Sequence, residues 1–211
     1  MFKPTAQHIR LIRTALFLLA LLPLVRVFVL GFYDQLTANP IEFITRSSGD
    51  WTLYFLMLTL AITPLRRLSG WNWLVKLRRM LGLFTFFYGA LHFTTFIWFD
   101  HFFDLQAIWK DVLKRPFITV GFTALVLLVP LAVTSNDTMM RLLGRHWQTL
   151  HKLVYAIAVL AMLHFWWMRA GKNDFTEPLI FGGIMALLLG CRVVFWLLAV
   201  RKHTGRVSGL F

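Results

Sequence analysis

The sequence predicts an all-α integral membrane protein, a six-transmembrane-helix bundle with both termini in the cytoplasm. Two observations predict a membrane protein: 58% of the 211 residues are hydrophobic, and the mean hydropathy is +0.67. Soluble domains are only about half apolar. A third observation predicts the helix count, because six apolar segments alternate along the chain with short charged connections.

Each expected span is judged by its length, since a helix needs about 20 mostly apolar residues to cross a bilayer. The expected spans are 11–31, 51–68, 80–99, 116–134, 150–169 and 178–200, within one domain covering 1–211. The third, fourth and sixth meet this length directly, whereas the second and fifth include flanking polar residues. The first is interrupted by Arg13 and Arg26, and no small-residue cleavage site follows it. We therefore expect an uncleaved span rather than a signal peptide.

The basic residues predict the orientation of the bundle. Fourteen of them fall at one end: Lys3, Arg10, Arg13, Arg66, Arg67, Lys76, Arg78, Arg79, Arg141, Arg145, Lys152, Arg201, Lys202 and Arg206. Six fall at the other: Arg46, Lys110, Lys114, Arg115, Arg169 and Lys172. The richer end is expected in the cytoplasm. A net charge of +13 is also typical of nucleic-acid binding, but basic residues confined to short loops favour the membrane interpretation, so no nucleic-acid partner is expected.

The sequence contains no constellation typical of a self-contained enzyme. The single Cys191 excludes a disulfide framework and a CxxC metal site. No GxGxxG or Walker motif and no nucleophile–base arrangement is evident. Only about ten residues follow Val200, so we expect no nicotinamide domain in this chain. No catalytic residue is assigned, and substrate chemistry is expected in a partner protein.

Two histidines lie at the same predicted depth in different spans. His92 lies 13 residues after Arg79, and His164 lies 13 residues after His151. Both spans run outward, so each imidazole is expected about 20 Å from the cytoplasmic end. Two imidazoles at one depth suit axial ligation of a haem iron. Zinc is a weaker alternative, because it needs three or four ligands and no cysteine or carboxylate lies at that depth.

The neighbours of these histidines are compatible with a flat apolar cofactor. Gly89 and Ala90 would allow a macrocycle to approach the backbone beside His92, and the aromatic residues 165–167 follow His164. Small residues also pack helices against each other, and tryptophan also forms interfacial belts. These neighbours therefore do not decide the assignment alone.

His151, Arg78 and Arg79 form a second expected polar group at the cytoplasmic end. The two arginines occupy the level at which a histidine partner for His151 would stand, so a second bis-histidine haem is not expected. Arginine suits phosphates and carboxylates. The site is expected to hold a flavin phosphate, or a haem bound by His151 alone with its propionates on the arginines. Alternatively, these residues contact lipid headgroups, as the positive-inside rule would predict.

Several motifs in order resemble a known family. They are "TPLRRL" (63–68), "RRMLGL" with "LH" at 91–92, "KRPFITVG" (114–121) and "LGRHWQTLHKLVY" (143–155) followed by His164. Together they resemble the ferric-reductase-like transmembrane superfamily and, over nearly the whole chain, its bacterial MsrQ (YedZ) family of haem-binding membrane subunits.

The resemblance implies a set of cofactors and partners. It implies b-type haem and FMN, with His92 and His164 as the outer haem pair and His151 as the inner histidine of the fifth span. The inner histidine of the third span has no match, since Arg78 and Arg79 stand in its place. It further implies electron transfer across the bacterial inner membrane. The donor would be the quinone pool or a cytoplasmic flavin reductase, and the acceptor MsrP, a periplasmic molybdopterin methionine sulfoxide reductase that repairs oxidised proteins.

Two other functions remain open from the residues alone. One is a ferric or other metal reductase with a different external acceptor. The other is a transporter in which the histidines form a proton relay, or a protein in which they only pack helices. The loops Asp100–Asp111 and Lys172–Glu177, with their mixed charges, are expected to form the surface for the external partner.

Overall fold

The computed structural model of the protein describes residues 4–171 and 173–207. Lys3 and Lys172, counted above among the basic residues, lie outside the described residues. The long helices are α1 (Ala6–Phe32), α2 (Pro40–Ser69), α3 (Val75–Thr95), α5 (Pro116–Val133), α8 (Leu153–Ala170) and α9 (Thr176–Val207). Short elements join them: η1 (Asn72–Leu74), the π-helical turn η2 (Phe96–Asp100), α4 (Leu105–Lys114), α6 (Asp137–Leu143) and α7 (Arg145–Leu150). Within the described residues the fold is all-α.

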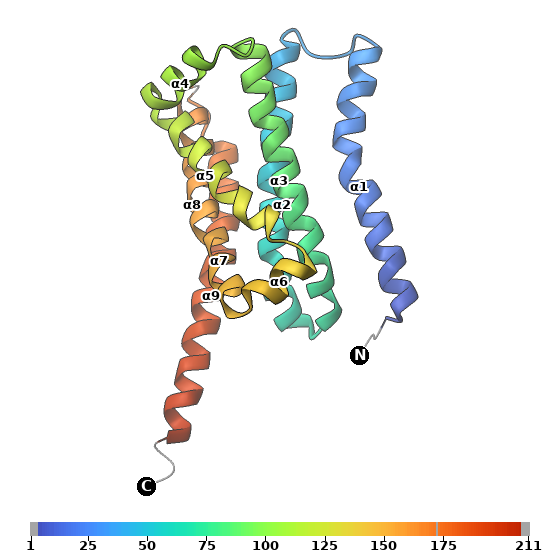
Figure 1. Ribbon diagram of the computed structural model, residues 1–211, viewed down its shortest axis with the longest axis vertical. Coiled ribbons are helices and arrows are strands. Elements are labelled where there is room, and N and C mark those ends of the chain that lie inside the picture. The colour runs from blue at the N-terminus through green and yellow to red at the C-terminus, as the bar shows by residue number, and fades with distance from the viewer. Residues whose placement is uncertain (1–3, 172, 208–211) are drawn as a thin grey trace.

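The six long helices alternate in direction, so that the bundle has two distinct ends (Figure 1). One end, called here the α4 end, carries α4 and the α1–α2 connection. The other, called the terminal end, carries α6, α7 and both ends of the chain. Each expected span falls largely within one long helix, but the bounds differ: α2 begins eleven residues before the expected start at 51, α1 and α3 each begin five residues early, and α9 continues seven residues beyond 200. The short helices in the connections were not expected from the sequence.

Local sequence signals explain where the helices begin and end. The side chain of Asn39 accepts a hydrogen bond from the backbone N–H of Glu42, and Pro40 occupies the first turn of α2, where its missing N–H costs nothing. The same helix ends at Gly70, whose φ of 72° is readily adopted only by glycine. Asp104 caps α4 by accepting from the backbone N–H groups of residues 106 and 107.

Among the described residues, five helical stretches are long and apolar enough to cross a membrane: Ala6–Phe32, Asn72–Asp100, Pro116–Val133, Arg145–Ala170 and Thr176–Arg201. Helix α2 is not among them. Its apolar part is bounded by Asp50 on one side and by Arg66 and Arg67 on the other. The physical reason is its position, because α2 contributes nine buried residues to the bundle. A helix enclosed by protein needs fewer lipid-facing apolar side chains than a peripheral one.

Two antiparallel helix pairs form the centre of the bundle. Helix α2 packs most extensively on α3, and α5 on α8, while α9 contacts α2 and α8. One apolar core lies among α2, α5, α8 and α9, around Leu60, Ile157 and Ala158. A second lies among α1, α2 and α3, where the rings of Phe55, Phe84 and Tyr88 stack. The space between the two pairs is the part of the fold that positions the site.

A half-buried arginine joins α9 to this centre. Pro64 has no N–H, so the carbonyl of Leu60 loses its ordinary helical partner. Arg192 donates to that carbonyl at 2.7 Å and to the Tyr155 hydroxyl at 2.7 Å. Two of the three nitrogens of a charged side chain within a span are thereby bonded to protein groups, while Nε has no partner among the described residues.

Candidate functional site

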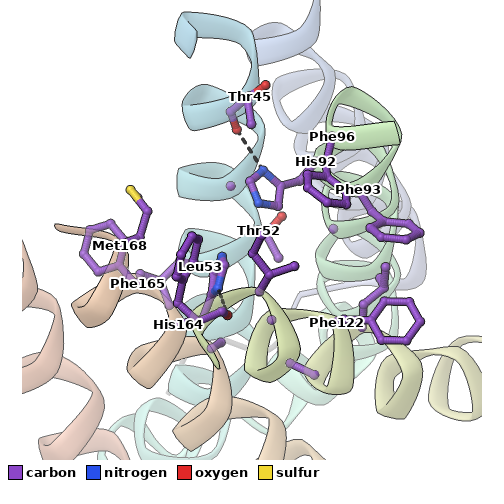
Figure 2. Close-up of a pocket in the computed structure, with 18 of the residues that line it drawn as sticks. Thr45, Thr52, Leu53, His92, Phe93, Phe96, Phe122, His164, Phe165 and Met168 are labelled. Atoms are coloured by element: carbon purple, nitrogen blue, oxygen red, sulfur yellow. Dashed lines mark hydrogen bonds between the residues drawn. The ribbon is translucent and has the colours of Figure 1, made fainter. Parts of the chain in front are cut away.

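His92 and His164 face each other across the space between the two helix pairs. His92 extends from α3 and His164 from α8, and their ring centroids are 6.1 Å apart (Figure 2). The structure therefore brings together the two histidines that the sequence placed at one depth. Two imidazoles bonded to one metal from opposite sides, at about 2 Å each, have ring centres roughly 6 Å apart. The observed spacing suits one metal ion between them.

Each of the two rings is oriented by a backbone carbonyl. The Nδ1 atom of His92 lies 2.8 Å from the carbonyl oxygen of Thr45, and the Nδ1 atom of His164 lies 2.7 Å from that of Phe117. A carbonyl only accepts, so each Nδ1 carries the proton and donates it. In a neutral imidazole this leaves the lone pair on Nε2. Metal-binding histidines are commonly held by this kind of second hydrogen bond, which fixes the tautomer and the ring direction.

A glycine lies against each imidazole. A Cβ atom on Gly49 would come within 3.2 Å of the His92 ring, and one on Gly121 within 2.7 Å of the Nδ1 atom of His164. The first distance is tighter than most real contacts, and the second is essentially never observed for a real Cβ. The facing helices α2 and α5 therefore need glycine at these positions to admit the rings.

One cavity contains both histidines and is otherwise mostly apolar. Its wall includes Phe93, Phe96, Phe117, Phe122, Phe165 and Met168, several of which surround the imidazoles in Figure 2. It extends to Thr85, seven residues and thus about 10 Å before His92 along α3. Towards the α4 end it reaches Asp50, Asp100 and two arginines, Arg46 and Arg115. A flat apolar group with an anionic edge would match this distribution of polarity.

The arginines at this mouth already have acidic neighbours. Arg46 Nη2 lies 2.8 Å from Glu42 one helical turn away, and Arg115 Nε lies 3.5 Å from Asp111. The Arg115 side chain is 57% exposed. Both guanidinium groups keep further donors, since each carries five N–H groups.

The chemistry of the donor set argues against zinc. Within residues 4–171 and 173–207, no three histidine, cysteine or acidic side chains gather in a way that could hold a metal ion. A structural zinc site needs four ligands and a catalytic one three. Two imidazole nitrogens facing one gap would instead suit a metal whose remaining ligands come from a macrocycle.

Comparisons with known proteins identify the family. Residues 48–162 match the family described as ferric reductase like transmembrane component. A relative from Herminiimonas arsenicoxydans is 62% identical over 209 residues, covering 99% of this chain and 95% of its own length. Relatives from Bordetella pertussis and Rhodospirillum rubrum are 58% and 53% identical, covering 91% and 88% of this chain and 93% and 88% of their own lengths.

All three relatives are described as protein-methionine-sulfoxide reductase heme-binding subunit MsrQ. The chain belongs to the MsrQ family. No solved structure matches it. The resemblance drawn from the motifs is thus confirmed at the level of the family. The matched region includes His92 and His151 and ends at Met162, two residues before His164.

An internal repeat relates the two halves of the site in this MsrQ-family chain. His92 and His164, Thr45 and Phe117, and Gly49 and Gly121 are each separated by 72 positions. The same offset superposes "LHF" at 91–93 on "LHF" at 163–165, and the leucines at 53 and 56 on those at 125 and 128. The pair α2–α3 is therefore repeated as α5–α8. Each histidine is held by the preceding helix of its own pair.

The residues that orient the imidazoles were not predicted from the sequence. The 72-residue offset is a signal for Gly49 and Gly121, which are identical at equivalent positions, but not for the carbonyls of residues 45 and 117. Not all of the expected neighbours of the histidines line the cavity. Gly89 lines the cavity, but Ala90 does not. Of the three aromatic residues after His164, only Phe165 lines the cavity, while Trp166 packs on Phe175 and Trp167 is exposed.

His151 lies at the terminal end, in a two-residue break between α7 and α8. Its ring stacks on Trp147, with centroids 3.8 Å apart, and its Nδ1 donates to the Trp147 carbonyl at 3.0 Å. Its Nε2 lies 3.5 Å from the Ser135 hydroxyl. His151 is therefore well separated in the fold from the His92–His164 pair.

The structure separates the two arginines that the sequence grouped with His151. Arg78 is half-buried and lies close enough to His151 and Arg192 to interact electrostatically. Arg79 is exposed and forms an ion pair with Asp137 of α6. This pairing holds the pKa of the Asp137 carboxyl below its ordinary value, chiefly through the hydrogen bond that Arg79 donates. Arg78 is thus brought towards His151, and Arg79 is not.

The acidic residues of the α4 end are largely engaged within the chain. Asp111 lies beside His101 and Arg115, and Arg169 contacts both Asp174 and Glu177. The exposed side of α4 instead carries the apolar side chains Leu105, Trp109 and Leu113. The surface expected for a partner therefore has fewer unpaired charged side chains than its sequence suggests, and it is more apolar.

Proposed function

We propose that this chain is a transmembrane electron carrier in which His92 and His164 bind one b-type haem as axial ligands. One observation carries the proposal: two imidazoles 6.1 Å apart, each with Nδ1 bonded to a backbone carbonyl, direct their free Nε2 atoms to one cavity. The relatives are named heme-binding subunits, which supports the same cofactor. When bound, haem iron supplies one-electron oxidation and reduction.

The residues around the cavity have separate roles in this proposal. The carbonyls of Thr45 and Phe117 fix the direction of the ligand nitrogens, and Gly49 and Gly121 leave room for the rings. The apolar wall excludes water. Arg46 and Arg115, at the α4 end of the cavity, are the residues that would hold the haem propionates, because arginine binds carboxylates through paired N–H donors.

The proposed membrane arrangement has six spans, with α2 as the span that hydropathy alone does not identify. Its 30 residues correspond to about 45 Å, enough to cross a hydrocarbon core of about 30 Å. The terminal end carries most of the basic residues, which supports a cytoplasmic location for it under the positive-inside rule. The α4 end would then face the periplasm across the bacterial inner membrane.

Electron flow follows from this arrangement. Electrons would enter at the terminal end from the quinone pool or a cytoplasmic flavin reductase. They would leave at the α4 end to MsrP, the periplasmic molybdopterin subunit that reduces methionine sulfoxide in oxidised proteins. The relatives' names, which refer to a methionine sulfoxide reductase, support such a partner. The substrate chemistry then belongs to the partner, and this chain supplies electrons.

We also propose a second cofactor at the terminal end, an FMN or a haem bound by His151 alone. The argument is distance, because His92 lies 13 residues, or about 20 Å, from the start of the basic stretch at Arg79. A donor at that end would otherwise face a long gap without a carrier. Arg78, which forms no hydrogen bond within the described residues, supports an anionic group there, either a flavin phosphate or a propionate.

Replacement of the two histidines tests the main proposal. His92→Ala and His164→Ala should each abolish the six-coordinate low-spin haem spectrum of the purified protein, and added imidazole should partly restore it. His101→Ala is the matched control, because His101 is also at the α4 end but lies beside Asp111 outside the cavity. A normal low-spin spectrum at full haem content in either alanine variant would show that the pairing is wrong.

A matched pair of arginine variants tests the second cofactor. Arg78→Gln should lower the content of the second cofactor and slow reduction of the His92–His164 haem by the donor. Arg79→Gln should have little effect on either, because its guanidinium group is engaged by Asp137. Equal behaviour of the two variants, or normal cofactor content and kinetics in Arg78→Gln, would remove this site from the scheme.

A further inference from the structure

A groove separates the upper part of α1 from the beginning of α2, on the side of the bundle away from the histidines. Helix α1 stands beside α2 and α3 at the edge of the bundle and is joined to α2 at the α4 end (Figure 1). The groove measures about 430 Å³ and is lined by apolar residues of α1, including Leu19, Leu22 and Val29, and by Phe43 of α2. This volume falls within the roughly 300–1,000 Å³ of sites that bind small molecules.

One charged residue lines this groove. Arg26 of α1 is exposed, although it lies within one of the five stretches that can cross a membrane. Among the described residues it has no hydrogen-bond or ion-pair partner. Arg192 of α9 is by contrast bonded to a hydroxyl and a carbonyl. A guanidinium group at membrane depth without a protein partner requires an anionic or water partner from outside the chain.

Two further donors lie on the opposite wall of the groove. The Ser47 hydroxyl and the Trp51 indole N–H both belong to lining residues of α2, and neither makes a hydrogen bond within the described part of the chain. No acidic residue is among the lining residues. The groove thus offers hydrogen-bond donors and positive charge, and a ligand with several acceptor oxygens would complement it.

The depth of these donors identifies the chemistry of the ligand. Arg26 lies six residues before the end of α1, or about 9 Å along the helix. Ser47 lies seven residues after the start of α2, or about 10 Å. Helix α2 is about 45 Å long, close to the thickness of a bilayer with its headgroups, of which the hydrocarbon core is about 30 Å. The donors therefore lie near the boundary between headgroups and hydrocarbon, where phospholipid phosphates are found.

We propose that the α1–α2 groove is a binding site for an anionic phospholipid, with the phosphate on Arg26 and an acyl chain along the apolar wall. A net negative lipid is favoured over a zwitterionic one, because Arg26 is the only charged side chain among the lining residues. A zwitterionic headgroup would bring its own cation into a site without an acid. The bound lipid fills the groove between α1 and the rest of the bundle.

Native mass spectrometry of the full-length, haem-loaded protein tests this inference. Delipidated protein in detergent is titrated with palmitoyl-oleoyl phosphatidylglycerol or with the phosphatidylcholine of the same chains. The wild-type protein should bind the first phosphatidylglycerol about tenfold more tightly than phosphatidylcholine, because both phosphates accept a hydrogen bond from Arg26 but only choline adds a cation that the guanidinium group repels. Arg26→Gln should abolish this preference, and Arg26→Lys should retain most of it.

Arg13→Gln is the matched control, because it removes the same charge from an exposed position of α1 that does not line the groove. It should leave the preference unchanged, and the haem spectrum of every variant should be normal. Equal affinities for the two lipids in the wild type, or an equal loss in Arg13→Gln and Arg26→Gln, would overturn the proposal. So would a short-chain benzoquinone that binds the wild type, fails to bind Arg26→Gln and displaces phosphatidylglycerol.

Discussion

Glycine-to-alanine substitution at Gly49 and at Gly121, the two glycines beside the imidazoles, should weaken haem binding to different extents. Ordinary van der Waals contact of a Cβ atom begins at about 3.4 Å. In Gly121→Ala the new methyl group would stand 2.7 Å from the His164 ring, so the ring must move by about 0.7 Å. In Gly49→Ala the corresponding distance to the His92 ring is 3.2 Å, and a shift of about 0.2 Å is enough.

The larger shift should weaken haem binding. The methyl group in Gly121→Ala approaches three atoms of the ring, including the Nδ1 that donates to Phe117 at 2.7 Å. Overpacking of this kind typically costs about 1–3 kcal/mol, which corresponds to roughly 5–150-fold in affinity. Gly49→Ala should change the affinity by less than about threefold, because a few tenths of an ångström are absorbed by small movements of the ring.

The assay is the haem-to-protein ratio of purified protein during titration with a competing apo-haem acceptor, together with the low-spin spectrum. Gly183→Ala on α9 is the control, since nothing lies within 4 Å of its new methyl group. An equal loss in Gly49→Ala and Gly121→Ala, or a greater loss in Gly49→Ala, would refute the reasoning from clearance.

Three further predictions concern residues outside the haem cavity. Arg192→Met should lower the stability of the bundle by about 2–4 kcal/mol, because two hydrogen bonds to a charged group are lost; thermal unfolding followed by tryptophan fluorescence measures this, and an unchanged midpoint would contradict it. The Arg79–Asp137 pair lowers the pKa of Asp137, so its stabilisation of α6 should be complete above the ordinary value of 3.8 and lost as the pH falls through the lowered pKa. Amide hydrogen exchange of α6 should show this acid dependence in the wild type and not in Asp137→Asn, and identical profiles would exclude the pair as its cause. Arg79→His should leave the haem content unchanged, because that side chain faces Asp137 rather than His151; a second equivalent of low-spin haem would show otherwise.

The depth of the histidine pair could be predicted because a helix converts sequence distance directly into axial distance. His92 and His164 are equally far from the basic starts of two spans that run in one direction, so residue counting was enough to place them level. The carbonyls of Thr45 and Phe117 could not be predicted in the same way. Every residue has a backbone carbonyl, so the residue type at a position does not indicate whether its carbonyl accepts a hydrogen bond from a histidine.

The limits of hydropathy explain the remaining differences. Hydropathy identifies helices that face lipid, and α2 contributes little lipid-facing surface because it lies in the centre of the bundle. Its span was expected from an apolar run too short to cross a bilayer without flanking polar residues. Helix α4 was not expected because the prediction was confined to spans of about 20 residues and α4 has only ten. Its apolar residues Leu105, Trp109 and Leu113 nevertheless follow one another at helical spacing.

The internal repeat accounts for the difference between the two ends of the protein. The 72-residue offset that relates His92 to His164 also relates Arg79 to His151, so the repeat itself predicts no second pair of facing imidazoles. The backbone adds a second reason. Helix α3 is continuous from Val75, whereas the corresponding part of the other pair is divided into α7 and α8 at His151 and Lys152. Equivalent positions therefore point in different directions, Arg79 towards α6 and His151 onto Trp147. The repeat is symmetrical at the proposed haem ligands, where two imidazoles face one cavity, and asymmetrical at the terminal end, where the proposed electron donor would dock.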